Sequence, residues 1–273
     1  MKRILVPTDF SEQAENALKV AIKLAKKHNS EVYVLHSLEI PMQYATAKDS
    51  GSLPESLYFI KLTEKRFNDL RNSDFLEGIT INETIGHNEI FEDINEACKN
   101  YDIDLIVMGS NGASGFKEMF VGSNTEKVVR TSEVPVLVIK NNHSEFNVED
   151  FVFATDFSEN SRGTLIQAYD FAKKIDAKLH LLYVNTPAGF KTSGQAQKLM
   201  EDFVDGIAIE NYSLNIYNDT SVEKGILNFT KFINGELIGM ATHGRKGISH
   251  FFNGSISEDM VNHANMPVIT FKK

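Results

Sequence analysis

Residues 104–140 read DLIVMGSNGASGFKEMFVGSNTEKVVRTSEVPVLVIK. Two short apolar runs lie at the ends of this segment, DLIVMG (104–109) and PVLVIK (135–140). Such runs are typical of parallel strands that are covered on both faces. The residues between them are first rich in glycine and then show helical spacing from about 124 to 131. The segment therefore predicts a strand, a loop, a helix and a second strand of an α/β fold.

Parts of the chain occur twice. ILVPTDFS (4–11) recurs as FVFATDFS (151–158), 147 positions later. VGSNTEKVVRTSEVPVLVIK (121–140) recurs as NGSISEDMVNHANMPVITFK (253–272), 132 positions later. Because two separate blocks recur in the same order, we infer an internal repeat whose second copy is 15 residues shorter in its middle.

The length of the chain agrees with two domains of ordinary size. The chain has 273 residues, and single domains cluster at roughly 100–150 residues. We expect one domain at 1–141 and a second at 149–273, joined by NNHSEFNVED (141–150), a short and polar stretch that suits a linker.

Apolar runs alternate with helical patterns in both copies. In the first copy, strands are expected near 3–8, 31–37, 79–85, 104–109 and 135–140, and helices after Ser11 and near 55–72, 91–100 and 124–131. In the second copy, strands are expected near 151–155, 178–184, 212–218, 236–241 and 267–272. This alternation predicts two doubly wound, Rossmann-like parallel sheets of five strands, with right-handed crossovers and helices on both faces.

Two helices carry sequence signals of their own. Ser11 is a good N-cap for the first helix. Near 55–72, Tyr58, Phe59, Phe67 and Leu70 form an apolar stripe, which we interpret as a packing surface.

A binding site is expected at one edge of the first sheet. Ligands of open parallel sheets bind beyond the carboxyl ends of the strands, and Asp9 comes just after the first strand. The fourth strand ends at Met108 and runs into a loop with the spacing G-x2-G-x9-G-S, formed by Gly109, Gly112, Gly122 and Ser123. Glycines let backbone N–H groups approach an anion, and a helix N-terminus adds free N–H donors. The loop is suited to a phosphate chain, although it is neither a Walker A sequence nor a Rossmann GxGxxG.

Simpler interpretations of these residues exist. Ser123 and Glu126 match a capping box, as do Ser255 and Glu258, so that Ser123 could serve only to begin the helix. Asp9 could be a turn residue without a ligand.

Taken together, VPTDFSEQAENAL, IGHNEIFEDI, DLIVMGSNG, the glycine spacing and SEVPVLVIK resemble the universal stress protein family in its tandem form. The likeness covers nearly all of the first copy and both ends of the second, and it is weak between about 190 and 235. It implies a sheet order of 3-2-1-4-5 and a pseudo-dimer of the two domains through their last strands. A homodimer of the whole chain is an open alternative. The likeness also implies binding of ATP, ADP or AMP, with or without Mg²⁺.

The resemblance assigns roles to residues of the first copy. Asp9 and the late position of the second strand, here Ser37, would hold the adenosine end. That position is usually apolar in the family, so Ser37 departs from the pattern. The phosphates would be held by the end of the fourth strand, the glycine loop and the N-terminus of the following helix. The residues at these places are Met108, Gly109, Gly112, Gly122, Ser123, Asn124 and Thr125.

The second copy keeps only part of this pattern. The matching positions are Asp156, Val184, Gly244, Gly254 and Ser255. Ala241 stands where the first copy has Gly109, and Ala154 replaces the usual proline. If this backbone needs φ > 0, a non-glycine residue costs about 1–2 kcal/mol, so we predict a weakened second site.

Composition narrows the partners. The net charge of −9 argues against nucleic acid. The sequence contains no run of eighteen apolar residues, so we expect no membrane-spanning helix. The first ten residues, MKRILVPTDF, are too polar for a secretory leader. The single cysteine, Cys98, lies on the apolar face of a predicted helix, where we expect it to be buried. A chain with one cysteine forms no internal disulfide and fits a reducing compartment, so we expect a cytoplasmic protein.

Three functional classes stay open from the sequence alone. A nucleotide-reading sensor or scaffold is favoured over a slow ATP-hydrolysing enzyme, because no catalytic base is evident, and over a structural protein with an empty site. The second copy contains His180, His243, His250 and His263, but they lack the spacing of a metal site, and we expect no metal bound by protein ligands.

Overall fold

The computed structural model describes residues 1–38, 53–110, 122–139, 146–242, 260–262 and 264–273, and the side chains of α3 from residue 57 onward. The first half alternates strands and helices as the apolar pattern predicts. Its elements are β1 (Arg3–Pro7), α1 (Glu12–His28), β2 (Glu31–Ser37), α3 (Leu53–Arg71), the 3-10 helix η1 (Asp74–Leu76), β3 (Ile81–Gly86), α4 (Ile90–Asn100), β4 (Leu105–Gly109), α5 (Ser123–Thr131) and β5 (Val136–Ile139).

The second half repeats this order. Its elements are β6 (Asp150–Ala154), η2 (Glu159–Ser161), α6 (Arg162–Ile175), β7 (Lys178–Asn185), η3 (Pro187–Gly189), α7 (Ser193–Val204), β8 (Tyr212–Asn218), α8 (Val222–Ile233), β9 (Leu237–Thr242) and β10 (Val268–Lys272). The expected strands of both halves are confirmed to within two residues at each end.

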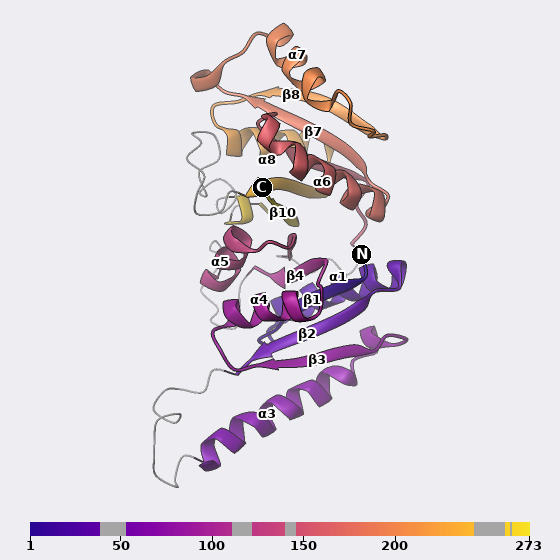
Figure 1. Cartoon of the computed structure of the whole chain (residues 1–273), viewed down its shortest axis with the longest axis vertical. Coiled ribbons are helices and arrows are strands. Elements are labelled where there is room, and N and C mark those ends of the chain that lie inside the picture. Colours follow the sequence, from indigo (N-terminus) through magenta and orange to yellow (C-terminus); the bar gives the residue numbers. More distant parts are fainter. Residues whose placement is uncertain (39–52, 111–121, 140–145, 243–259, 263) are drawn as a thin grey trace.

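All ten described strands form one sheet, in the order β3-β2-β1-β4-β5-β10-β9-β6-β7-β8 (Figure 1). Each half therefore has the expected order 3-2-1-4-5. Neighbouring strands are parallel within each half. At the junction, β5 and β10 pair antiparallel, with Leu137 opposite Ile269. The prediction of a Rossmann-like α/β fold with a mostly parallel sheet is confirmed.

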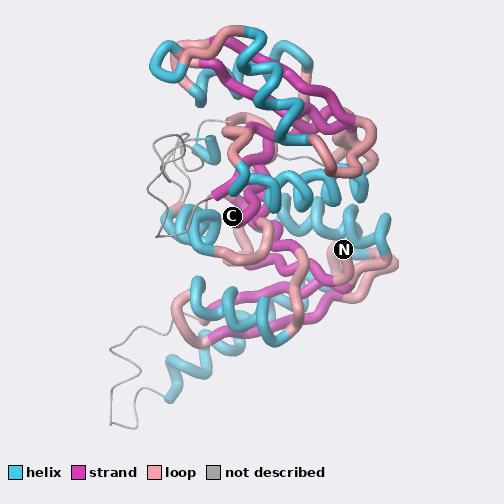
Figure 2. The backbone as a smooth tube through the Cα atoms, turned by 45° about the horizontal axis from the view of Figure 1, so that its top comes forward, coloured by secondary structure: helices cyan, strands magenta, loops and turns pink. Residues whose placement is uncertain are grey.

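Helices cover both faces of the sheet (Figure 2). On one face, α1, α3, α6 and α7 pack on the strands through a cluster that includes Leu18, Phe67, Leu165 and Met200. On the other face, α4, α5 and α8 pack through a second cluster. Strand residues alternate between the two clusters, as expected for strands buried on both sides.

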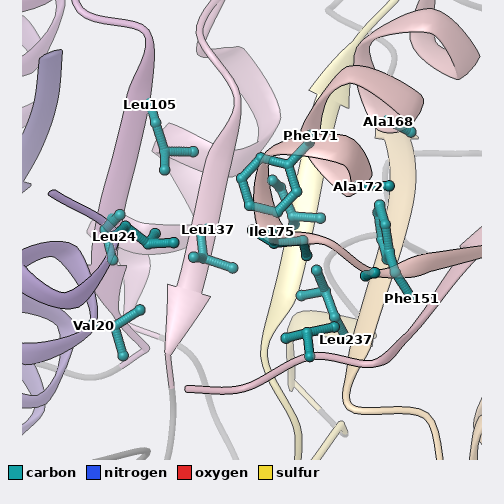
Figure 3. Close-up of a cluster of buried hydrophobic side chains, with 14 of the residues drawn as sticks. Val20, Leu24, Leu105, Leu137, Phe151, Ala168, Phe171, Ala172, Ile175 and Leu237 are labelled. Atoms are coloured by element: carbon teal, nitrogen blue, oxygen red, sulfur yellow. The ribbon is translucent and has the colours of Figure 1, made fainter. Parts of the chain in front are cut away.

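The hydrophobic core is continuous across the two halves. Leu24 and Leu137 of the first half belong to the same buried cluster as Phe171 and Ile175 of the second (Figure 3). The two halves also meet in an ion pair between Lys27 Nζ and Asp176 Oδ2 (2.5 Å), where α1 and α6 end. Apolar burial therefore reinforces the strand pairing at the junction.

The structure corrects three expectations about packing. The stripe on α3 is only partly buried, because Phe67 is 2% exposed and Phe59 and Leu70 are half-buried, whereas Tyr58, on the opposite face of the helix, is 62% exposed. The N-terminal end of α3 projects away from the sheet (Figure 1). The segment 141–150 is not wholly polar linker, since Phe146 and Val148 are buried in the core. Cys98 is only partly buried.

No helix in the described part of the chain is long and apolar enough to cross a membrane.

Candidate functional site

The turn after β1 holds Asp9 in a defined position. The Thr8 N–H donates to the carbonyl of Leu35 (2.8 Å), which ties the end of β1 to β2. The Phe10 N–H donates to Thr8 Oγ1 (2.9 Å), and the Ser11 N–H donates to Asp9 Oδ1 (3.0 Å). Asp9 therefore does act as a turn residue, and its partly exposed carboxylate also lies at the carboxyl end of β1.

Phe10 adopts a left-handed conformation with φ of 62°. This conformation costs a non-glycine residue about 1–2 kcal/mol, so the surrounding packing must stabilise it. The Phe10 ring lies 4.8 Å from the His36 ring and 5.1 Å from the Phe67 ring, measured between centroids, and the Arg66 guanidinium lies over it. His36 Nδ1–H in turn donates to the Thr8 carbonyl (2.8 Å). Aromatic packing thus stabilises the turn that presents Asp9.

Ser11 begins α1 as predicted. It is the N-cap of the helix, and its hydroxyl accepts a hydrogen bond from the Ala14 N–H (3.3 Å). Glu12 and Glu15 lie in the first turn, where the helix dipole favours negative charge.

Gly109 is required for a reason other than the one expected. It lies in extended β4, and no positive φ occurs there. Instead, a Cβ at Gly109 would stand 2.8 Å from the backbone carbonyl of Gln13 in α1. The missing side chain therefore allows the first turn of α1 to pack directly against the end of β4.

The N-terminus of α5 is attached to the end of β4. The Thr125 hydroxyl donates to the Gly109 carbonyl (2.9 Å), and the Gly122 N–H donates to the Ser110 carbonyl (2.8 Å). The capping box predicted for Ser123 is wrong: Gly122 is the N-cap, and no side chain caps this helix among the described residues. Because Ser123 is already inside the helix, its hydroxyl has no capping role to fulfil.

Ser37 and Met108 occupy different environments at the same edge of the sheet. Ser37 ends β2 beside Gly86 of β3. Its Oγ is buried and has no hydrogen-bond partner among the described residues. Met108 is 5% exposed, with its side chain in the apolar cluster beneath α4 and α5. Ser37 therefore leaves a buried hydroxyl without a hydrogen bond among the described residues, whereas Met108 contributes only apolar packing.

Several predicted site residues lie outside the described residues, namely Gly112, Gly244, Gly254 and Ser255. The structure does bring together Asp9, Ser37, Gly109, Gly122 and Ser123 at the carboxyl edge of the first half, through β1, β2, β4 and α5. Asn124 is exposed in the first turn of α5, whereas Thr125 is buried.

The equivalent aspartate of the second half is in a different setting. Asp156 Oδ1 accepts hydrogen bonds from the Ser158 N–H (3.1 Å), the Ser158 hydroxyl (2.9 Å) and the Ser161 hydroxyl (2.6 Å). Lys273 Nζ lies 3.4 Å from Asp156 Oδ2. Burial alone would raise the pKa of the Asp156 carboxyl, but the hydroxyl and N–H donors and the ammonium group together lower it.

The backbone at Ala241 differs from the one expected. Ala241 lies inside β9 and has no positive φ, so a left-handed penalty does not apply there. In the first half, the end of β4 packs against the first turn of α1. In the second half, the 3-10 helix η2 replaces that turn, and α6 begins only at Arg162. Val184, the counterpart of Ser37, is 6% exposed and packs against Gly225 of α8.

One polar cluster was missed in the sequence. His180 Nε2 lies 2.6 Å from Asp150 Oδ1, and His180 Nδ1 lies 3.0 Å from the Ser213 hydroxyl. The three residues lie on the neighbouring strands β6, β7 and β8, and the register of these strands brings them together. Their spacing in the sequence does not indicate this contact. His180 is 7% exposed, and the two contacts satisfy its ring beneath Phe229. No group of three or more metal-ligating side chains occurs in the described ranges.

A shallow, open depression of about 510 Å³ lies between the C-terminal ends of α1 and α6. It lies away from Asp9 and Ser123, because α1 starts at the carboxyl end of β1 and runs back. Its lining residues are charged or polar, namely Lys27, His28, Asp170, Lys173, Lys174 and Asp176. Lysines at helix C-termini stabilise the helix dipole, which accounts for this composition without a ligand.

The fold and the site define a tandem Rossmann-like α/β protein, and comparisons with known proteins identify its family. A model of the universal stress protein family matches residues 1–140 and 217–272, more than half of the chain. Universal stress protein MJ0577 of Methanocaldococcus jannaschii is 34% identical over 157 residues, which cover 52% of this chain and 97% of that protein. Universal stress protein Slr1230 of Synechocystis is 25% identical over the full length of both chains.

The fold comparison gives the same result. The crystal structure of a universal stress protein from Archaeoglobus fulgidus superposes with a TM-score of 0.71 at 26% identity, covering 99% of this chain and 96% of the other. The chain belongs to the universal stress protein family, in the tandem two-domain form.

Proposed function

We propose that this universal stress protein binds ATP or a related adenine nucleotide in its first half and acts as a nucleotide-reading sensor or scaffold in the stress response. The observation that carries the proposal is the N-terminus of α5. Its N-cap is Gly122, which has no side chain to cap the helix, and two hydrogen bonds attach it to the end of β4. A helix N-terminus in that position offers N–H donors and a positive dipole end to a phosphate chain.

The other residues at this edge fit the adenosine end. Asp9 is fixed at the carboxyl end of β1, and a carboxylate is the kind of group that accepts hydrogen bonds from the hydroxyl or amino groups of an adenosine. The buried Ser37 hydroxyl lacks a partner among the described residues, and an unsatisfied buried polar atom favours a ligand group or a water that completes its hydrogen bond.

A nucleotide would therefore lie across the carboxyl ends of β2, β1 and β4. The N–H groups of Ser123 and Asn124 would hold the phosphates, together with the glycine loop of which Gly112 is part. Any Mg²⁺ would arrive with the phosphates as part of the ligand. ATP, ADP and AMP differ only in the number of phosphates at this end.

We further propose that the chain folds as two domains, 1–141 and 149–273, that pair within one molecule. The β5–β10 ladder and the continuous apolar core support this pairing. Because the last strand of each half is paired, neither is left as an exposed edge. A homodimer of the whole chain would need a different surface.

The first experiment asks whether nucleotide is present at all. Protein purified under native conditions is denatured, and the released small molecules are identified by mass spectrometry. We expect an adenine nucleotide at up to one equivalent per chain. A phosphate-release assay then separates a binder from a slow hydrolase, which is the second functional class.

The second experiment tests the site. A fluorescent ATP analogue is titrated into wild type, Gly122→Val and Gly194→Val. Gly194 lies in α7 with open space around it, so this variant controls for the added valine. We expect Gly122→Val to weaken binding by at least about tenfold, which corresponds to ~1.4 kcal/mol, and the control to bind as wild type does. Equal binding by all three folded proteins would exclude the N-terminus of α5 as the phosphate site.

A further inference from the structure

The two halves use the same aspartate-and-serine turn differently. In the first half, the Ser11 hydroxyl accepts a hydrogen bond from the helix it caps. In the second half, the equivalent Ser158 hydroxyl donates to the Asp156 carboxylate, and the following residues form η2 without a side-chain cap. The serine of the second half therefore helps to hold the aspartate in place of capping a helix.

Two sequence differences supply the additional donors to Asp156. Ser161 aligns with Ala14 of the first copy, which has no hydroxyl. Lys273 aligns with Asn141 of the first copy, which has no charge and lies outside the described residues. Both replacements act on one carboxylate: Ser161 Oγ lies 2.6 Å from Oδ1 and Lys273 Nζ lies 3.4 Å from Oδ2.

The backbone fixes Lys273 at the carboxyl edge of the second half. The Lys273 N–H donates to the Thr242 carbonyl (3.1 Å), which continues the pairing of β10 with β9 by one residue. The preceding Lys272 contacts the Thr131 carbonyl of the first half (3.4 Å). Neighbouring strand residues point to opposite faces, so Lys273 is the one that reaches Asp156.

We propose that Lys273 closes the adenosine end of the second site and thereby determines that the chain binds one nucleotide tightly instead of two. This proposal rests on the proposed function, because it assigns to Asp156 the role that Asp9 has in the first half. Lys273, assisted by Ser161, is an internal occupant that a nucleotide must displace.

The contacts show why displacement is unfavourable. Asp156 Oδ1 already accepts from one amide and two hydroxyls, which fills its two lone-pair positions, and Lys273 is the donor that lies on Oδ2. The Lys273 and Asp156 side chains are only 10% and 15% exposed, so water screens their attraction less than at the surface. A nucleoside hydroxyl would have to replace a charged donor with a neutral one, and the charged donor makes the stronger bond.

The test restores the residues of the first copy. Calorimetric titration of the full chain with ATP compares wild type, Lys273→Asn and the double variant Ser161→Ala/Lys273→Asn. Lys178→Asn removes an exposed lysine at the opposite end of the sheet and controls for the change in charge. We expect one tight site in wild type and in the control, and a second site in the double variant that is at least about tenfold tighter than in wild type.

Further variants assign the new site. Asp156→Asn added to the double variant should remove the second site and leave the first, whereas Asp9→Asn should do the opposite. Lys273→Met keeps the length of the side chain, and it serves as the second route if the asparagine variants melt at a lower temperature than the titration allows. Lys273→Arg keeps the charge and should retain a single site.

The outcomes separate this proposal from the proposed function. One site in wild type and still one in both folded Lys273→Met and the double variant would overturn the closure by Lys273. Two equal sites in wild type would also overturn it. If wild type binds no nucleotide, the proposed function is contradicted. Binding that appears only after Lys273 is replaced would then still support the closure by Lys273. If no variant binds nucleotide, both the proposed function and the closure are overturned.

Discussion

Gly109→Ala places a methyl group at the contact between β4 and α1. Its Cβ would lie 2.8 Å from both the carbonyl carbon and the carbonyl oxygen of Gln13. These are backbone atoms of a helix, so no side-chain rotation can relieve the overlap. The first turn of α1 must move away from the sheet, although Ser11 and the Asp9 turn fix its start.

The size of the effect follows from the rigidity of this contact. Inserting a methyl group into a well-packed site costs about 1–3 kcal/mol. For a folding unit of 150–250 residues, each kcal/mol lowers Tm by roughly 2–4 °C, so we expect a fall of roughly 2–12 °C. Movement of α1 also displaces Asp9, so nucleotide affinity should fall together with stability.

Thermal melting followed by dye fluorescence measures the first effect, and titration with a fluorescent ATP analogue measures the second. Ala241→Gly is the matched control, because it makes the reverse change at the equivalent position of the second half. A glycine in a strand costs only about 0.5–1 kcal/mol, so its Tm should fall less. If Gly109→Ala melts within about 1 °C of wild type, α1 is not held against β4 as described, and the argument fails.

Three further changes test other parts of the structure. The pKa of the Cys98 thiol is raised by burial from 9.0 to about 12, so its thiolate fraction at pH 8 should be about 10³-fold lower than in denaturant and it should react more slowly with a thiol reagent; equal rates would contradict its partial burial. The pKa of Asp156 is lowered in the folded state, so the stability that its ionised carboxylate contributes is present above the unfolded pKa and is lost as the pH falls through the folded pKa. The Tm of wild type should therefore exceed that of Asp156→Asn at pH 7, and the difference should shrink below about pH 4. A difference in Tm that persists there would refute the hydrogen-bond network around Asp156. A protease site inserted within 141–145 should, after cleavage, leave the halves associated in gel filtration at micromolar concentration, and separation would contradict the β5–β10 pairing.

The architecture could be predicted well because it follows from local pattern. Apolar runs such as 105–108 and 136–139 lie within β4 and β5. The repeat then transfers the topology of one half to the other. The stripe assigned to α3 was drawn too wide: Tyr58 precedes Phe67 by about two and a half helical turns, so it lies on the opposite face and is 62% exposed while Phe67 is 2% exposed.

The positions of the candidate site residues in the fold follow from the sequence pattern, but their contacts do not. Asp9 and the start of α5 lie where strand order places them, since parallel strands end at one edge. The capping box at Ser123 failed because a matching pattern does not reveal where the helix begins. The contact between Lys273 and Asp156 joins residues 117 positions apart, so only the register of β10 against β9 brings them together.

The antiparallel pairing of β5 with β10 also has a consequence for concentration. In a dimer of separate subunits, such an interface forms only when the protein is abundant enough. Here both strands belong to one chain, and a short connection gives its ends an effective concentration in the millimolar range. The paired state is therefore equally populated when the protein is scarce and when it is abundant, so an increase in its amount changes the number of paired molecules and not the extent of pairing.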